Sequence, residues 1–188
     1  MNKLFIISGS SGVGKGTVIK ELLKKNNANV KLSVSTTTRK PREGEKHGEH
    51  YFFVEREDFL NSVDKNEFIE WAEFSGNCYG TKKAFVEETL KNGQNVLLEI
   101  DTQGALQIKK IMPEAILIFI APPSLEELKK RLVGRGTETE EAIQKRLSCV
   151  EAEQEKSKQY DYVVINDTVE KAVENLENIF KKENNEQI

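Results

Sequence analysis

The chain has 188 residues, of which 31% are charged and 37% are hydrophobic, and its formal net charge is −3. This length predicts one domain with its own core, and the absence of an apolar run of roughly 20 residues argues against a membrane partner. A net negative charge supplies no global positive field, so we expect no nucleic-acid partner. The amino terminus lacks the pattern of a secretory signal, which predicts a cytoplasmic protein.

The amino-terminal segment predicts a strand, a phosphate-binding loop and a helix. Residues 4–7 form an apolar run, and the spacing of Val18, Leu22 and Leu23 is helical. Between them, glycines let backbone N–H groups converge on phosphate oxygens, while the helix amino terminus and a lysine add positive charge. The predicted loop consists of Gly9, Ser10, Ser11, Gly12, Val13, Gly14, Lys15, Gly16 and Thr17. This pattern predicts a nucleoside triphosphate as the ligand.

One position departs from the common form of this loop. A serine or threonine usually follows the lysine and holds Mg²⁺, whereas here Gly16 intervenes and the hydroxyl belongs to Thr17. We expect Thr17 to face a phosphate, and we expect Mg²⁺ to be held by the nucleotide, by water and by a carboxylate elsewhere. The sequence therefore indicates no certain protein ligand for the metal.

A small β-rich insert is expected over residues 34–83. The predicted elements here are strands over 30–35, 51–54 and 68–74, a hydrophilic loop over 36–50 and a short helix over 57–63. The segments over 30–35 and 68–74 alternate between apolar and polar residues, which is typical of strands.

The second half of the chain predicts alternating strands and helices. The predicted elements are a helix over 83–91, strands over 95–101 and 115–121, helices that begin near Ser124 and Thr137, a strand over 162–165 and a helix capped by Thr168. This alternation indicates a three-layer α/β/α core with a parallel sheet, in which ligands bind at the carboxyl ends of the strands. We expect the core to comprise residues 1–33, 84–124 and 149–188.

Two arginines in the loop over 36–50 predict a second anion site. Arg39 and Arg42 are three residues apart, and Pro41 restrains the backbone between them. Arginine forks match phosphate oxygens bidentately, so the pair could hold a phosphate monoester. A solvated basic loop is the alternative, and Tyr51 and Tyr79 favour the anion site only if folding brings them close.

Three carboxylates lie within or at the end of predicted strands. Glu70 stands next to Trp71, where it could accept the N1–H and amino hydrogens of guanine; the polar face of a strand is the simpler alternative. Glu99 and Asp101 are two residues apart, so in one strand both would point to the same face, at the end where the phosphate loop opens. They could orient water on Mg²⁺, with Asp101 reaching the metal only through water, or contact the second anion site; a solvated strand end is the alternative.

Four segments, 35–42, 68–72, 79–81 and 134–137, resemble motifs of guanylate kinases, in order and over nearly the whole chain. The resemblance implies a P-loop NTPase core, a GMP-binding insert and a helical lid near residues 125–148. It implies that the GMP phosphate is held by Arg39, Arg42, Tyr51 and Tyr79, and that the guanine is bound by Ser35, Glu70 and Thr81, with Gly80 in the same motif. The family often has serine at the position of Thr81, and many relatives have aspartate at the position of Glu99.

The resemblance also implies which residues bind ATP and act on the transferring phosphoryl group. It implies that Arg131, Arg135 and Arg146 stabilise the transferring phosphoryl group together with Lys15 and Arg39, and that Asn166 borders the adenine of ATP. The implied reaction is the Mg²⁺-assisted conversion of ATP and GMP to ADP and GDP in purine nucleotide metabolism, with dGMP as a further substrate. The oligomeric state stays open between monomer and homodimer.

Two other functions stay open from the sequence. Guanylate-kinase-like interaction modules keep the fold but bind protein ligands, and the intact Lys15 and Arg135 argue against that class. The run Gly14-Lys15-Gly16-Thr17 also resembles adenylate kinases, so a different base specificity is possible. Glu70 discriminates, because adenine lacks the N1–H and the exocyclic amine at C2 that the carboxylate would accept.

Overall fold

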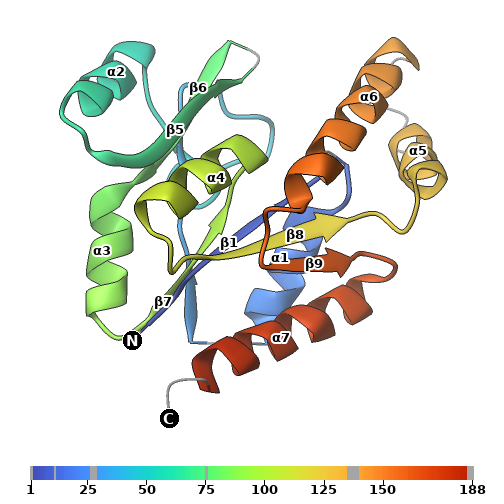
Figure 1. Cartoon of the computed structure of the whole chain (residues 1–188). Coiled ribbons are helices and arrows are strands. Elements are labelled where there is room, and N and C mark those ends of the chain that lie inside the picture. Colours follow the sequence, from blue (N-terminus) through green and yellow to red (C-terminus); the bar gives the residue numbers. More distant parts are fainter. Residues whose placement is uncertain (1, 11, 26–28, 75, 135–139, 186–188) are drawn as a thin grey trace.

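The computed structural model describes residues 2–10, 12–25, 29–74, 76–134 and 140–185. Its main sheet has five parallel strands: β1 (Leu4–Gly9), β2 (Val30–Leu32), β7 (Asn95–Glu99), β8 (Ile116–Ala121) and β9 (Tyr162–Ile165). They lie in the order β2-β7-β1-β8-β9, with β1 in the middle (Figure 1). The chain builds one side of β1 first and then crosses to the other, and parallel sheets bind their ligands at the carboxyl ends of strands near such a crossing.

Helices cover both faces of this sheet: α1 (Lys15–Lys24) and α7 (Val169–Asn185) on one face, α3 (Lys83–Lys91) and α4 (Thr102–Ile111) on the other. Successive side chains of β1 alternate between the faces. Phe5 and Ile7 therefore share a buried cluster with α1 and α7, whereas Leu4 and Ile6 belong to the cluster of α3 and α4. The expected three-layer core with a parallel sheet is confirmed.

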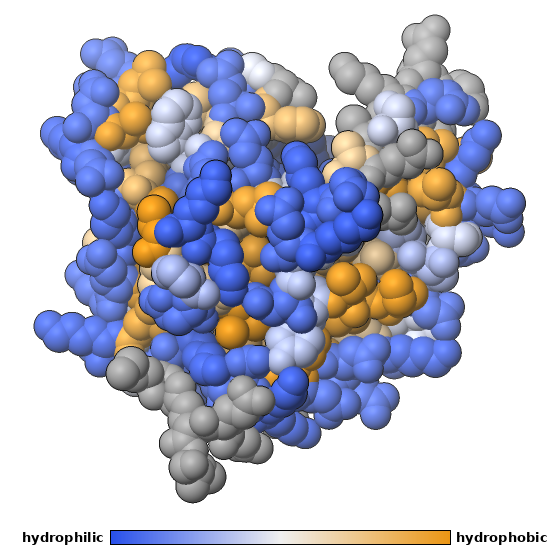
Figure 2. All heavy atoms as spheres, in the orientation of Figure 1, coloured by the Kyte–Doolittle hydropathy of each residue, from blue (hydrophilic) through white to orange (hydrophobic). Residues whose placement is uncertain are grey.

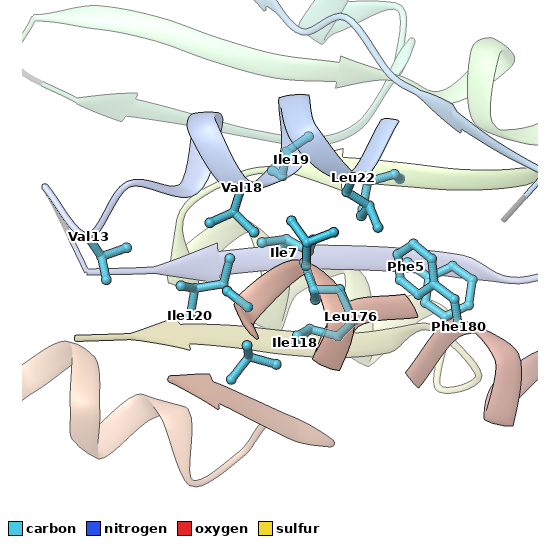
Figure 3. Close-up of a cluster of buried hydrophobic side chains, with 14 residues drawn as sticks. Phe5, Ile7, Val13, Val18, Ile19, Leu22, Ile118, Ile120, Leu176 and Phe180 are labelled. Carbon is cyan, nitrogen blue, oxygen red and sulfur yellow. The ribbon is translucent and has the colours of Figure 1, made fainter. Parts of the chain in front are cut away.

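Figure 3 shows the cluster between the sheet and the helices α1 and α7. Val18, Ile19 and Leu22 extend from α1 toward the sheet. The rings of Phe5 and Phe180 lie with their centroids 4.2 Å apart. Burial of each such side chain contributes about 1.5–3 kcal/mol, so this cluster holds β1 firmly in the middle of the sheet and positions the loop that follows it.

The insert contains a second, four-stranded sheet in the order β4-β3-β6-β5. The strands are β3 (Thr36–Thr37), β4 (Phe52–Phe53), β5 (Phe68–Phe74) and β6 (Asn77–Lys82), and the insert also contains the helix α2 (Arg56–Asp64). Phe59 of α2 stacks on Phe68 with ring centroids 4.5 Å apart, and Cys78 is buried beside them. This small core gives the insert its own support.

The strand predicted over 30–35 is shorter in the structure, and the loop predicted over 36–50 contains a strand. The N–H of Ser33 donates to Leu97 in the main sheet, whereas the carbonyl of Ser35 accepts from Phe52 in the second sheet. Residues 33–35 thus carry the chain from one sheet to the other. Periodicity could not reveal this change, because the alternation of side chains continues through it.

The helices α5 (Leu125–Gly134) and α6 (Glu140–Ser157) pack together through a small cluster of Leu128, Leu147 and Val150. The hydroxyl of Ser124 accepts the N–H of Glu127 at 3.1 Å, which confirms the predicted start of α5. Figure 1 shows this pair beyond β8, on the side of the molecule away from α2. The α6 helix continues without a break through residue 148, where the lid is expected to end. Within the described ranges, no helix is both long enough and apolar enough to cross a membrane.

Glu183 ties the carboxyl-terminal helix to the sheet. Its carboxylate accepts hydrogen bonds from Lys3 Nζ at 2.7 Å and from the Tyr162 hydroxyl at 2.6 Å. Burial by itself would raise the pKa of Glu183, but the hydrogen bonds from Lys3 and Tyr162 outweigh it and lower the pKa. A carboxyl group with a lowered pKa stabilises the fold above its ordinary pKa, and this contribution is lost as the pH falls through the folded-state value.

We expect Glu183→Gln to lower the free energy of unfolding at pH 7 by about 1–3 kcal/mol, because two donors lose a charged acceptor. At a pH below the ordinary value of 4.5, the difference from the unchanged chain should shrink. Urea unfolding at pH 7 and at low pH measures both quantities. Glu174→Gln, an exposed change on the same helix, is the control; an equal loss of stability in the two variants would contradict the role of Glu183.

Candidate active site

The phosphate-binding loop joins the carboxyl end of β1 to the first turn of α1. Gly12 and Gly14 have φ angles of 84° and 94°, a region that favours glycine. Gly9 is required for another reason, because a Cβ atom there would lie 2.3 Å from the carbonyl oxygen of Ile120 on β8. The first N–H groups of α1, which have no partner within the helix, therefore lie at the middle of the sheet edge, where they can bind an anion.

Lys15 folds back over this loop. Its Nζ donates to the carbonyl oxygen of Gly9 at 2.7 Å. Burial lowers the pKa of Lys15, and the carboxylates of Glu99, Glu153 and Asp101 act in the opposite direction. The ammonium group is thus held at the loop by the backbone and by the surrounding negative charge. Of the other predicted loop residues, Ser10 and Val13 are buried, while Gly16 and Thr17 are exposed.

Asn166 supports the loop from the next strand but one. It follows β9, is 3% exposed, and its Nδ2 donates to the carbonyl oxygen of Val13 at 2.7 Å. Its own N–H donates to Ala121 at 2.8 Å, so backbone and side chain together join β8, β9 and the loop. The side chain of Asn166 therefore supports the backbone of the loop. The sequence did not indicate this role.

Replacing Asn166 by alanine should leave the carbonyl of Val13 without its donor and loosen the loop. Because a lost buried hydrogen bond costs about 1–3 kcal/mol, we expect the affinity of the loop for a nucleoside triphosphate to fall about tenfold, with a much smaller change at the second anion site. Titration of the chain with a nucleoside triphosphate and with a nucleoside monophosphate measures the two affinities. The neighbouring Asp167→Asn is the control, and equal losses of affinity at both sites would show that the loop is not the part affected.

The second anion site is built on the loop between β3 and β4. The guanidinium of Arg39 lies 5.4 Å from the ring centre of Tyr51 and 5.8 Å from that of Phe53. The rings of Tyr51 and Tyr79 are 6.1 Å apart between centroids. Folding therefore brings both tyrosines to Arg39, which was the condition that favoured an anion site over a solvated basic loop. The side chain of Arg42, close by in the chain, is exposed.

Glu45 is a further residue of this site, and no local pattern in the sequence singles it out. Arg39 Nη2 donates to its two carboxylate oxygens at 2.8 and 2.9 Å, and the backbone N–H of Arg42 donates to Oε2 at 2.7 Å. The hydrogen bond from Arg39 is the main cause of the lowered pKa of Glu45. Both carboxylate oxygens here accept from the same nitrogen of Arg39, a charge-assisted contact that phosphate oxygens can also make.

Glu70 and Thr81 face each other on the neighbouring strands β5 and β6. The Thr81 hydroxyl donates to Glu70 Oε1 at 2.7 Å, and Glu70 is only 7% exposed. Burial raises the pKa of Glu70 to about 7, against the hydrogen bonds from Thr81. Gly80 lets β6 pack closely, since a Cβ there would lie 2.9 Å from the ring of Phe68. Ser35, half-buried, leads into β3 of the same sheet.

The prediction that Glu99 and Asp101 extend from one strand is wrong. The strand β7 ends at Glu99, and Asp101 is the cap of α4, where its Oδ1 accepts the N–H groups of Gln103 and Gly104 at 2.7 and 2.9 Å. An aspartate two residues beyond the end of a strand satisfies the first N–H groups of a helix, and this local bonding ends the strand. Both carboxylates nevertheless lie close enough to Lys15 to affect its pKa.

Glu99 is the carboxylate beside the phosphate loop. A Cβ atom built on Gly16 would lie 3.9 Å from its Oε1. Desolvation by the surrounding protein raises the pKa of Glu99, although part of the side chain is open to solvent. Across the described ranges, no group of three or more histidine, cysteine or acidic side chains could hold a metal ion by itself. Mg²⁺ usually keeps several waters and binds substrate phosphates with one or two carboxylates, and Glu99 beside the loop fits that requirement.

The lid residues complete the predicted set. Ser11 and Arg135 lie outside the described residues, and so do the side chains of Arg131 and Arg146, which belong to α5 and α6. Figure 2 shows a notch at the upper edge of the molecule, between the insert and the α5–α6 pair. Gly104 in the first turn of α4 lies against Glu70 of β5, so the insert packs on the helix that follows β7 of the main sheet.

A central parallel sheet, a glycine-rich loop at the end of its middle strand and a separate site with Arg39 define a nucleotide-binding α/β protein of the P-loop class. Comparison with known proteins narrows the class. The family model described as guanylate kinase matches residues 1–183. The chain therefore belongs to the guanylate kinase family, and the interpretation as an enzyme is confirmed.

Individual relatives agree with this family. The guanylate kinase of Clostridioides difficile is 53% identical over 182 residues, which cover 97% of this chain and 88% of the relative. The guanylate kinase of Bacillus anthracis is 54% identical over 176 residues, 94% of this chain and 86% of the relative. The crystal structure of guanylate kinase from Anaplasma phagocytophilum is similar with a TM-score of 0.80 and 36% identity, covering 97% of this chain and 86% of that one.

Proposed function

We propose that the protein catalyses the reversible transfer of the γ-phosphoryl group of ATP to GMP, assisted by Mg²⁺, and that it also accepts dGMP. In the cell this reaction belongs to cytoplasmic purine nucleotide metabolism. The observation that carries the proposal is the buried Glu70–Thr81 pair, which lies in the same small sheet as the Arg39 anion site.

The edge of guanine explains the choice of base. Guanine presents two adjacent donors, the N1–H and the 2-amino group, and the two oxygens of an ionised carboxylate accept both. Adenine presents an acceptor at N1, which would face the Glu70 carboxylate without a proton between them. Thr81 holds Oε1 of Glu70 at 2.7 Å, so the carboxylate is oriented before the base binds. Ser35 and Gly80 complete this base-binding region of the insert.

The GMP phosphate is bound by Arg39, Arg42, Tyr51 and Tyr79. The Glu45 carboxylate orients the Arg39 fork through Nη2. Arg39 keeps further donors, and Arg42 extends a second guanidinium into solvent from the same loop. A monoester phosphate bridging the two forks would be fixed in both distance and orientation.

ATP is bound by the phosphate loop, and the reaction is an in-line attack of a GMP phosphate oxygen on the γ-phosphorus. Positioning and charge neutralisation dominate phosphoryl transfer, so cations matter more than a general base. Lys15 lies at the loop for this purpose, and Arg131, Arg135 and Arg146 of the lid join it. Mg²⁺, when bound, would supply positive charge against the negative charge that develops on the transferring group. Glu99 beside Gly16 would hold its waters, and Asp101 would act on it only through water.

The three parts of the chain have separate tasks in this proposal. The core carries the triphosphate loop, the insert over residues 34–83 binds GMP, and the lid over 125–148 closes on ATP. Closure excludes water and limits hydrolysis of ATP when GMP is absent. The cations then converge only when both nucleotides are bound.

The test is the production of ADP by the purified chain from Mg·ATP with GMP, dGMP, AMP, CMP or UMP as the acceptor. Rapid turnover confined to GMP and dGMP is the expected result. Turnover with AMP would contradict the guanine site at Glu70, and omission of Mg²⁺ should abolish the reaction. Measuring ADP formed without any acceptor shows how well the site excludes water.

A further inference from the structure

The first turn of α4 contains a glycine that touches the base-binding carboxylate. A Cβ atom on Gly104 would lie 2.7 Å from Oε2 of Glu70 and 3.3 Å from its Cδ. Contacts under 3.0 Å do not occur for real Cβ atoms, so any side chain at this position displaces the carboxylate or the helix. Gly104 and Glu70 come from different elements, α4 and β5, that pack against each other.

The backbone of Gly104 gives no other reason for a glycine. Its φ angle is not among the positive ones, and the residue lies inside a helix, where alanine is more favourable than glycine. Its N–H donates to Asp101 Oδ1 at 2.9 Å, a bond that any residue except proline can make. The space that the Glu70 carboxylate occupies is therefore what requires glycine.

The carboxylate is thus confined from two sides. The Thr81 hydroxyl holds Oε1 at 2.7 Å from β6, and Oε2 lies against the bare backbone of α4. Two contacts on opposite oxygens set the rotation of the carboxylate plane as well as its place. Rotation matters, because a guanine edge must meet both oxygens in one plane.

We propose that Gly104 is a positioning residue for guanine specificity: by having no side chain, it lets the Glu70 carboxylate take the rotation at which its two oxygens accept the N1–H and the 2-amino group of guanine. The inference rests on the proposed function of Glu70. A methyl group at residue 104 pushes Oε2 aside, so contact with the 2-amino group is lost first.

The experiment compares GMP with inosine monophosphate, which keeps the N1–H but lacks the 2-amino group. In Gly104→Ala, we expect the KM for GMP to rise about tenfold and the preference for GMP over inosine monophosphate in kcat/KM to fall by a similar factor. The KM for ATP should not change. Gln103→Ala, an exposed change in the same turn, should leave all three quantities unchanged. An unchanged preference in Gly104→Ala would overturn the inference.

Combining Gly104→Ala with Glu70→Ala separates the inference about Gly104 from the proposed function of Glu70. If Gly104 acts through Glu70, then adding Gly104→Ala to Glu70→Ala causes no further loss of preference. A further loss in that background would overturn the inference. If Glu70→Ala alone keeps the preference for GMP, the proposed function of Glu70 fails instead.

Thermal stability supplies a readout that does not need activity. A glycine-to-alanine change in a helix ordinarily raises Tm, so Gly104→Ala should lower Tm only because of the crowded carboxylate. In Glu70→Asp, whose carboxylate is one methylene shorter, the same change should raise Tm. An increase in Tm in both backgrounds would overturn the inference, even if one of the variants were inactive.

Discussion

Glu70→Gln is expected to lower kcat/KM for GMP by about 10³-fold, because an amide offers guanine one acceptor and one donor where the base needs two acceptors. The same change should make the folded chain more stable at pH 8. Activity and stability thus move in opposite directions, which distinguishes a binding group from a structural one.

The stability gain follows from proton binding. Burial raises the pKa of Glu70 from 4.5 to about 7, so between these values the folded state binds more protons than the unfolded state. Stability therefore falls as the pH rises through this window, and above about pH 7 the deficit levels off at about 3 kcal/mol. Glutamine has no charge to desolvate, and its carbonyl oxygen still accepts from Thr81.

Urea unfolding of both proteins at pH 5 and pH 8 measures this difference. The unchanged chain should lose stability between the two pH values relative to Glu70→Gln; parallel behaviour would show that Glu70 is not a buried ionisable group. Guanine needs the ionised carboxylate, so the KM of the unchanged enzyme for GMP should also rise as the pH falls below about 7. Glu73→Gln, an exposed change on the same strand, is the control for both measurements.

Lys15→Met is expected to lower kcat by about 10³-fold and to change Tm little. Methionine has a similar length, but it removes the cation that the structure holds at the loop by a 2.7 Å bond to Gly9. The protein no longer bears the cost of burying that charge, which offsets the lost hydrogen bond.

Single-turnover measurements with saturating ATP and GMP isolate this effect from binding. Lys20→Met on the exposed face of the same helix should turn over at the normal rate. Normal turnover in Lys15→Met would show that the lysine takes no part in the reaction. A large fall in Tm would show that the lysine stabilises the fold instead.

Local sequence patterns predicted much of the fold. The strand β1, its glycine-rich loop and α1 are neighbours in the chain, and their signals are a continuous apolar run, glycines and a helical spacing. The starts of α5 and α7 were predicted from Ser124 and Thr168, whose hydroxyls accept N–H groups three residues on, at 3.1 and 3.3 Å. Such bonds form within one turn, so the sequence alone determines them.

Two predicted strands had wrong bounds, and in both the sequence fits more than one local structure. Residues 95–101 are apolar and then acidic, which suits a longer strand, but Asp101 caps α4 and ends the sheet at Glu99. Residues 30–35 alternate as one strand, although the chain leaves the main sheet after Leu32 and enters the second sheet at Thr36. The local cap at Asp101 decided the first case. Tertiary pairing decided the second, because only a partner strand shows which hydrogen bonds the backbone makes.

The sequence by itself determined the class of core, the phosphate loop and the types of residue that could bind phosphates and a base. Only the tertiary structure decided how these residues are supported. Asn166 reaches Val13 across 153 positions of the chain, and Gly104 leaves room for a carboxylate that belongs to another element. Neither contact leaves a local pattern, since periodicity and capping report on neighbours within a few residues, whereas packing brings together atoms that are distant in sequence.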